Sequence, residues 1–155
     1  MSLDCVTPNG KRFIASQNEV CRRIEAAMKV RVIATDNDSK APVDAVIEKG
    51  DMIAAVAEIK SRQMTYEQLE RFGTYLITAE KLDSLILAAR LLYAEGFLFV
   101  HLIKDGKIVY WKICDDEGVP CFEYKTERTV TQATCNGGTA TRLNAFLPVS
   151  RCRVL

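Results

Sequence analysis

Pro42-Val43-Asp44 and, thirteen residues further on, Glu58-Ile59-Lys60 are the segments that decide how this chain folds. Residues 43–48 and 52–60 have the apolar patterns of two β-strands, and Lys49-Gly50-Asp51 between them predicts a hairpin turn. Because side chains alternate along a strand, Glu58 and Lys60 project to one face and Ile59 to the other. Asp44, near the end of its strand, is then expected across from the Glu58 and Lys60 end of its neighbour.

This hairpin gathers two carboxylates and one ammonium group on an apolar strand. Residues 52–57 are apolar on both faces, as expected of an interior strand that is covered on both sides. Burying charges is costly unless they are paired or bind a metal. Carboxylates and a backbone carbonyl are ligands that Mg²⁺ prefers, and a nearby lysine can position a water or stabilise phosphate charge. The alternative is an ordinary ion pair between Glu58 and Lys60 at an exposed strand end.

The residues before the hairpin predict one helix and one strand. Residues 1–15 are rich in turn formers, and Ser16 with Glu19 matches the N-cap and N3 positions of a capping box. A helix is therefore expected from Ser16, with its apolar face formed by Val20, Ile24, Ala27 and Met28. A short β-branched strand is expected over 30–35, followed by a loop over 36–39.

The residues after the hairpin alternate between helix and strand signals. Thr65 is expected to cap a helix over 66–72, and 75–78 is expected to be a strand, with a continuous helix as the alternative. Residues 80–94 have helical periodicity, with Gly96 as the expected stop. A second hairpin is expected over 97–104 and 107–114, around Asp105-Gly106. Beyond Asp115 the pattern weakens, and strands are expected near 122–124 and 144–149. The order predicts a layered α/β domain with a mixed sheet.

Length and composition favour one ordinary globular domain. The chain has 155 residues, of which 48% are apolar, and its 21 basic and 20 acidic residues almost cancel. Charges scattered through residues 1–30 argue against a signal peptide, and the longest apolar runs, Leu85–Ala89 and Phe97–Ile103, are much shorter than the roughly 20 residues that cross a bilayer. We therefore expect a soluble, cytosolic protein. The six cysteines include no CxxC pair and His101 is the single histidine, so free thiols are expected rather than a zinc site.

The motif and its surroundings resemble the PD-(D/E)XK nuclease superfamily, whose restriction-endonuclease-like core runs helix, three strands, helix, strand. Asp44 matches its metal-binding aspartate and Glu58-Ile59-Lys60 its (D/E)-X-K. The run Glu58–Arg62 is similar to archaeal Holliday-junction resolvases and phage-type nucleases. The resemblance covers about residues 16–113 of a single domain over 1–155. The sequence departs from the superfamily pattern at Val43, which separates the proline from the aspartate. Residues 115–155 form a C-terminal extension of unknown role.

The resemblance implies a role for each candidate residue. Asp44, Glu58 and the backbone carbonyl of Ile59 would ligate Mg²⁺, or Mn²⁺ in its place, while Lys60 orients the attacking water and offsets charge on the phosphate. In those resolvases and phage-type nucleases a glutamate of the first helix also reaches the metal, and Glu19 is in the matching place, with Glu25 as the alternative. Less specific matches are Gln68 near the site, Lys81 at a phosphate and Arg62 as a DNA backbone clamp; a solvated polar surface is the alternative for these. His101, Tyr110 and Trp111 are expected to pack in the sheet.

The function implied by the resemblance is a metal-dependent DNA nuclease, with a role in the processing of phage or mobile-element DNA. Its partner is then DNA, a homodimer is one expected assembly, and neither a membrane nor a nucleotide cofactor is involved. If the chain is phage-encoded, the compartment is the cytoplasm of a bacterial host. One alternative is a catalytically inactive member of the fold that serves as a nucleic-acid-binding or assembly module. Another is an unrelated α/β protein in which the three charged residues coincide by chance.

Overall fold

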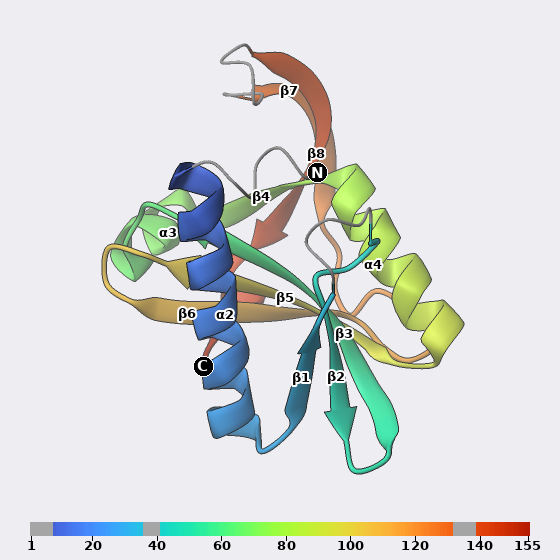
Figure 1. Ribbon diagram of the computed structural model, residues 1–155. Coiled ribbons are helices and arrows are strands. Elements are labelled where there is room, and N and C mark those ends of the chain that lie inside the picture. Colours follow the sequence, from blue (N-terminus) through green and yellow to red (C-terminus); the bar gives the residue numbers. More distant parts are fainter. Residues whose placement is uncertain (1–7, 36–40, 132–138) are drawn as a thin grey trace.

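This chain folds into two β-sheets with helices packed against them. The computed structural model describes residues 8–35, 41–131 and 139–155 (Figure 1). Its helices are α2 (Pro8–Met28), α3 (Tyr66–Phe72), α4 (Ala79–Leu92) and the 3-10 turn η1 (Val149–Arg151). Its strands are β1 (Arg31–Ala34), β2 (Ala45–Lys49), β3 (Met52–Arg62), β4 (Thr74–Thr78), β5 (Glu95–Leu102), β6 (Lys107–Cys114), β7 (Lys125–Thr131), β8 (Ala140–Pro148) and β9 (Arg153–Val154).

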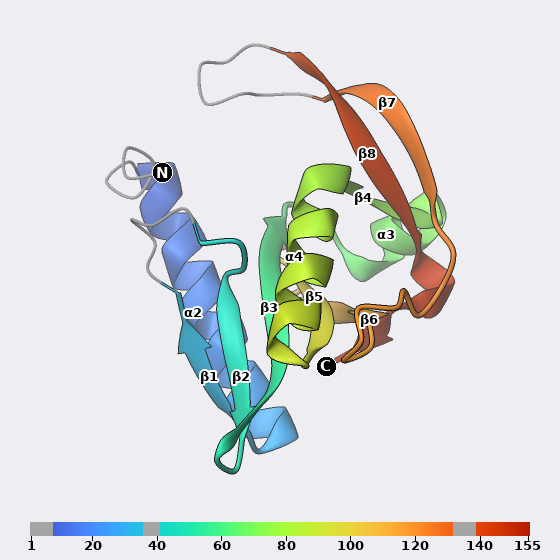
Figure 2. The ribbon, with the colours of Figure 1, turned by 90° about the vertical axis from the view of Figure 1, so that its right-hand side faces the viewer.

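The larger sheet has six strands in the order β1-β2-β3-β5-β6-β9. Its pairs are antiparallel except β3 with β5, which run parallel because α3, β4 and α4 lie between them in sequence. On one face α2 packs Val20, Cys21 and Ile24 against residues that include Ala57 and Ile59 of β3. On the other face lies α4 (Figure 2). β3 is thus covered on both sides, which explains its almost continuous apolar sequence.

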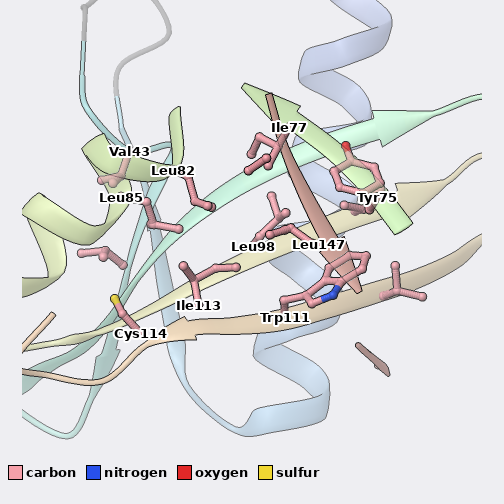
Figure 3. Close-up of a cluster of buried hydrophobic side chains, with 14 of the residues drawn as sticks. Val43, Tyr75, Ile77, Leu82, Leu85, Leu98, Trp111, Ile113, Cys114 and Leu147 are labelled. Carbon is pink, nitrogen blue, oxygen red and sulfur yellow. The ribbon is translucent and has the colours of Figure 1, made fainter. Parts of the chain in front are cut away.

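A second sheet of three strands, β4-β8-β7, packs on the same face as α4. Tyr75 and Ile77 of β4 and Leu147 of β8 meet Leu98 and Trp111 of the larger sheet in one buried cluster (Figure 3). The indole nitrogen of Trp111 donates a hydrogen bond to the carbonyl of Pro148, 2.9 Å away. This bond, together with the burial of both surfaces, fixes the second sheet on the first.

The predicted fold class is confirmed: a central mixed sheet is flanked by helices. Both hairpins form at their predicted turns, with Gly50 and Gly106 in the positive-φ conformation that such turns favour. Thr65 caps α3 with the complete capping box. The segment expected at 75–78 is a strand, but it pairs with β8 in the second sheet and not with its sequence neighbours.

The predicted start of the first helix is wrong. The helix begins at Pro8, so Ser16 and Glu19 lie within it and form no capping box. A proline fits the first turn of a helix because its φ is already helical and its missing N–H has no partner to lose. Pro8, within the stretch that is rich in turn formers, instead opens the helix.

Two other boundary predictions are also wrong. The helix α4 ends with Tyr93 in the left-handed conformation, while Gly96 lies within β5, where an added Cβ would be 2.7 Å from the Cys114 sulfur. The space beside Cys114, not a helix stop, thus requires the glycine. Residues 122–124 form no strand, because Phe122 and Tyr124 pack edge to face and lie against the core.

Other expectations are met or lie outside the described residues. Cys21, Cys114, Cys121 and Cys152 are free thiols, as predicted, while Cys5, Cys135 and the loop expected over 36–39 fall in segments that the structure does not describe. The division into a core and a C-terminal extension stays a prediction, although β8 supplies Ala145 and Leu147 to the same cluster as β5. None of the described helices has the length and hydropathy needed to span a lipid bilayer.

Candidate metal centre

Glu58 lies in the middle of β3 and is buried, with its side chain 1% exposed. It shares with Lys60 the face of β3 that points toward α4, as strand alternation predicts. The Lys60 ammonium is 2.7 Å from Oε1 of Glu58, and the ammonium of Lys81, in the first turn of α4, is 3.7 Å from the same oxygen. The other oxygen, Oε2, accepts no hydrogen bond from any residue that the structure describes.

Asp44 lies just before β2, opposite this part of β3. Its backbone N–H donates to the carbonyl of Ala57 at 2.9 Å, and its Oδ2 accepts from the N–H of Ile59 at 2.8 Å. On the other side, the N–H of Thr35 donates to the Asp44 carbonyl at 2.9 Å. These bonds hold Asp44 beside the (D/E)-X-K segment. Asp44, Glu58 and Lys60 therefore lie near one another, as expected from the hairpin.

The electrostatics of the site favour an added positive charge. Burial raises the pKa of Glu58 above its ordinary value, and the nearby charge of Asp44 raises it further, whereas Lys60 and Lys81 act in the opposite direction. Two acids thus share a poorly solvated space with cations on one side. A divalent ion near both carboxylates would lower the cost of ionising Glu58.

The residues present fit a divalent metal with an incomplete protein shell. No group of three or more His, Cys, Asp or Glu side chains suitable for a metal gathers within 8–35, 41–131 and 139–155. Mg²⁺, however, is often held by one or two carboxylates, with waters and substrate phosphates completing its shell. The unpartnered Oε2 of buried Glu58 is the observation that fits such an ion.

Glu19 is not joined to this centre by any contact among the described residues. The helix α2 covers the opposite face of β3, and the carboxylate of Glu19 pairs with Arg22, whose hydrogen bond lowers the pKa of Glu19. The alternative residue, Glu25, accepts a hydrogen bond from the backbone N–H of Val32 on β1 at 3.3 Å. The proposed metal role of either glutamate stays a prediction.

The three less specific candidates, Lys81, Gln68 and Arg62, make different contacts. Lys81 reaches the centre directly through Glu58. Gln68 is used in the capping box of α3, where its Oε1 accepts from the N–H of Thr65 at 2.9 Å. Arg62 lies on the same strand as Glu58, with its guanidinium 5.3 Å from the centre of the Tyr75 ring.

The fold of this chain is similar to that of an archaeal Holliday junction resolvase. The resolvase, Hjc from Archaeoglobus fulgidus, aligns with a TM-score of 0.51 over 91% of this chain and 84% of its own, with 15% sequence identity. No family model and no curated protein matches the sequence. The likeness therefore establishes a common fold over most of this chain.

Two buried polar side chains near these elements were missed by the sequence analysis. Tyr75 is 2% exposed, its hydroxyl has no hydrogen-bond partner among the described residues, and burial raises its pKa to about 12. Gln17 of α2 is 3% exposed and its Oε1 is likewise unpaired. A detectable signal existed for Gln17, because it occupies the helical stripe of Val20, Cys21 and Ile24, where a polar residue is unusual.

Proposed function

We propose that this protein is a metal-dependent nuclease that hydrolyses phosphodiester bonds in DNA. The observation that carries the proposal is the buried carboxylate of Glu58. Its Oε1 is 2.7 Å from the Lys60 ammonium, and the next residue, Ile59, donates its N–H to Asp44. Its Oε2 has no hydrogen-bond partner among the described residues. A fold similar to that of a Holliday junction resolvase supports it. We further propose that the protein processes phage or mobile-element DNA in a bacterial cytoplasm and assembles as a homodimer. In this proposal Mn²⁺ can replace Mg²⁺.

In this proposal Asp44, Glu58 and the carbonyl of Ile59 hold Mg²⁺. A bound Mg²⁺ supplies a more acidic water and neutralises charge on the scissile phosphate. Lys60 orients the attacking water and stabilises the negative charge that develops on the phosphate oxygens. Lys81 adds a second positive charge beside Glu58. The proposal also takes Glu19 as a further ligand and Gln68 and Arg62 as DNA contacts.

The test is cleavage of supercoiled plasmid and end-labelled linear DNA with Mg²⁺ or Mn²⁺. We expect activity that EDTA abolishes and that Lys60→Ala lowers about 10²–10³-fold, the usual cost of losing one preorganised charge-stabilising group. Lys112→Ala is the matched control, because Lys112 forms a 2.8 Å ion pair with Glu95 outside the candidate site. Wild-type protein that leaves linear, nicked, single-stranded and branched DNA intact would contradict the proposal.

A second candidate is a catalytically inactive module of the same fold that binds nucleic acid or assembles with other proteins. It is favoured by the pairing of Glu58 with Lys60 and by the lack of a group of three metal-ligating side chains in the described part of the chain. DNA binding without cleavage, unchanged by EDTA, is the result that it predicts.

A further inference from the structure

An open cleft of about 820 Å³ lies between the first turns of α4 and the hairpin of β7 and β8. Residues 128–131 of β7 pair with residues 140–143 of β8, beyond the end of β4, and we call these paired segments the arm. Figure 2 shows the arm curving above the N-terminal end of α4. The cleft is therefore walled by a helix on one side and by the arm on the other.

The cleft adjoins the candidate metal centre. Lys81 is one of its lining residues, and the ammonium of Lys81 is 3.7 Å from Oε1 of Glu58. A molecule that fills the cleft would therefore contact Lys81, whose ammonium lies beside the buried carboxylate of Glu58.

The lining combines three cations with two acids, Glu80 and Asp83, and with apolar surface. Arg128 and Arg142 of the arm line it together with Lys81, and none of the ion pairs among the described residues includes either arginine. Leu87 of α4 and Leu143 of the arm also line it, and their side chains are 48% and 43% exposed. Cations and apolar surface in one cleft suit a chain of phosphates that carries flat, weakly polar bases.

The arm is held in place at its base. Asn144 is 1% exposed, and its side-chain amide donates to Oγ1 of Thr129 at 2.6 Å and to the carbonyl of Arg142 at 3.3 Å. The bond to Thr129 links β8 to β7 where the arm begins, and the bond to Arg142 lies within β8. The arginines are therefore presented by a braced hairpin.

We propose that this cleft binds a single strand of DNA next to the phosphate that is cleaved. The proposal rests on the nuclease function above and adds the form of the substrate and the residues that hold it. The volume lies within the range of about 300–1,000 Å³ found for small-ligand sites, which suits a few nucleotides. Arg128, Arg142 and Lys81 contact phosphates, while Leu87 and Leu143 contact bases and sugars.

The test measures binding of a fluorescent single-stranded oligonucleotide in EDTA, so that no cleavage occurs, over a range of salt concentrations. For Arg128→Ala/Arg142→Ala we expect weaker binding and a slope of log K against log salt that is smaller by about 1.4, because each phosphate contact on a single strand contributes about 0.7. Glu80→Gln/Asp83→Asn, which removes the two acids of the lining, is expected to strengthen binding. Arg71→Ala/Arg153→Ala changes two exposed arginines outside the lining and is the matched control.

The outcomes separate this inference from the proposed function. If the arm variant binds single strands with the wild-type affinity and salt slope while the wild type still cleaves plasmid, the cleft assignment is wrong and the nuclease stands. Wild-type binding to duplex alone also overturns the assignment. If the wild type neither binds nor cleaves any DNA, both proposals fail. A thermal unfolding curve of the arm variant that matches the wild type confirms that the lost binding does not come from misfolding.

Discussion

Glu58 is an acid in the interior of a sheet, and the surrounding protein satisfies only part of its charge. Lys60 and Lys81 approach one of its oxygens, and the other has no hydrogen-bond donor among the described residues. A buried charge that the protein stabilises only in part often marks a site where a bound ligand supplies the remaining contacts. The proposed ligand, Mg²⁺, should therefore stabilise the fold as well as support catalysis.

We predict that millimolar Mg²⁺ raises the melting temperature of the wild type and that EDTA reverses the effect. At a free ion concentration about 100 times the dissociation constant the gain is about 2.7 kcal/mol. For a chain of this size that corresponds to roughly 5–10 °C, at about 2–4 °C per kcal/mol. Glu58→Gln and Asp44→Asn should each abolish the Mg²⁺-dependent rise, whereas Glu48→Gln, which breaks an exposed pair with Arg31, should keep it. An equal rise in all four proteins would mean that the ion binds elsewhere.

Among the elements, α2 is anchored to the larger sheet by a small polar network. The hydroxyl of Ser16 lies 2.6 Å from Oγ of Ser61 on β3 and 2.7 Å from Nδ1 of His101 on β5. Burial, with the charge of Arg23, lowers the pKa of His101 below its ordinary value, while Glu19 acts in the opposite direction. The folded protein therefore favours the neutral imidazole.

This shift predicts how stability depends on pH. A histidine with a lowered pKa in the folded state contributes stability that is present above its ordinary pKa of 6.5, and this contribution is lost as the pH falls through the lowered value. Urea unfolding of the wild type should thus show decreasing stability below about pH 6.5. In His101→Gln that part of the slope should disappear, although other groups still titrate. A wild-type slope that persists unchanged in the variant would show that His101 is not its source.

The same scale shows what the sequence could predict and what it could not. Hairpins at Gly50 and Gly106 and the cap at Thr65 depend on neighbouring residues, so local patterns were sufficient. Asp44 and Glu58 come together for the same reason, because one short hairpin connects them. The pairing of β4 with β8 joins residues about 70 positions apart, and no local pattern encodes it. Lys81 reaches Glu58 only because α4 packs across β3, which likewise depends on tertiary structure.

For the whole molecule, the C-terminal strands have two separable roles. The part of β8 that pairs with β4 carries Ala145 and Leu147, which are fully buried, whereas β7 is largely exposed. One part of the hairpin thus completes the core, and the arm serves the cleft.

Two deletions test this division. Removal of residues 140–155 should abolish cooperative unfolding and near-UV circular dichroism, because the lost burial is large compared with the usual total stability of about 5–15 kcal/mol. Removing the arm by joining Glu127 to Asn144 through Asn-Gly should leave the melting temperature within a few degrees of the wild type, since residues 128–131 pair with 140–143, beyond the residues of β8 that pair with β4. A shortened protein as unfolded as the truncated one would show that the arm is part of the folding unit.

The placement of β8 between β4 and β7 also has a consequence for biosynthesis. Thr74 pairs with Pro148, so β4 waits for about 70 further residues before its partner is made. At about 5–20 residues per second, the ribosome needs roughly 4–15 s to supply them. During that interval Tyr75 and Ile77 lack the strand that covers them, and the nascent chain carries an unpaired, apolar strand edge. Slow codons placed between these two segments would lengthen this exposure, and a chaperone that shields apolar strands would relieve it.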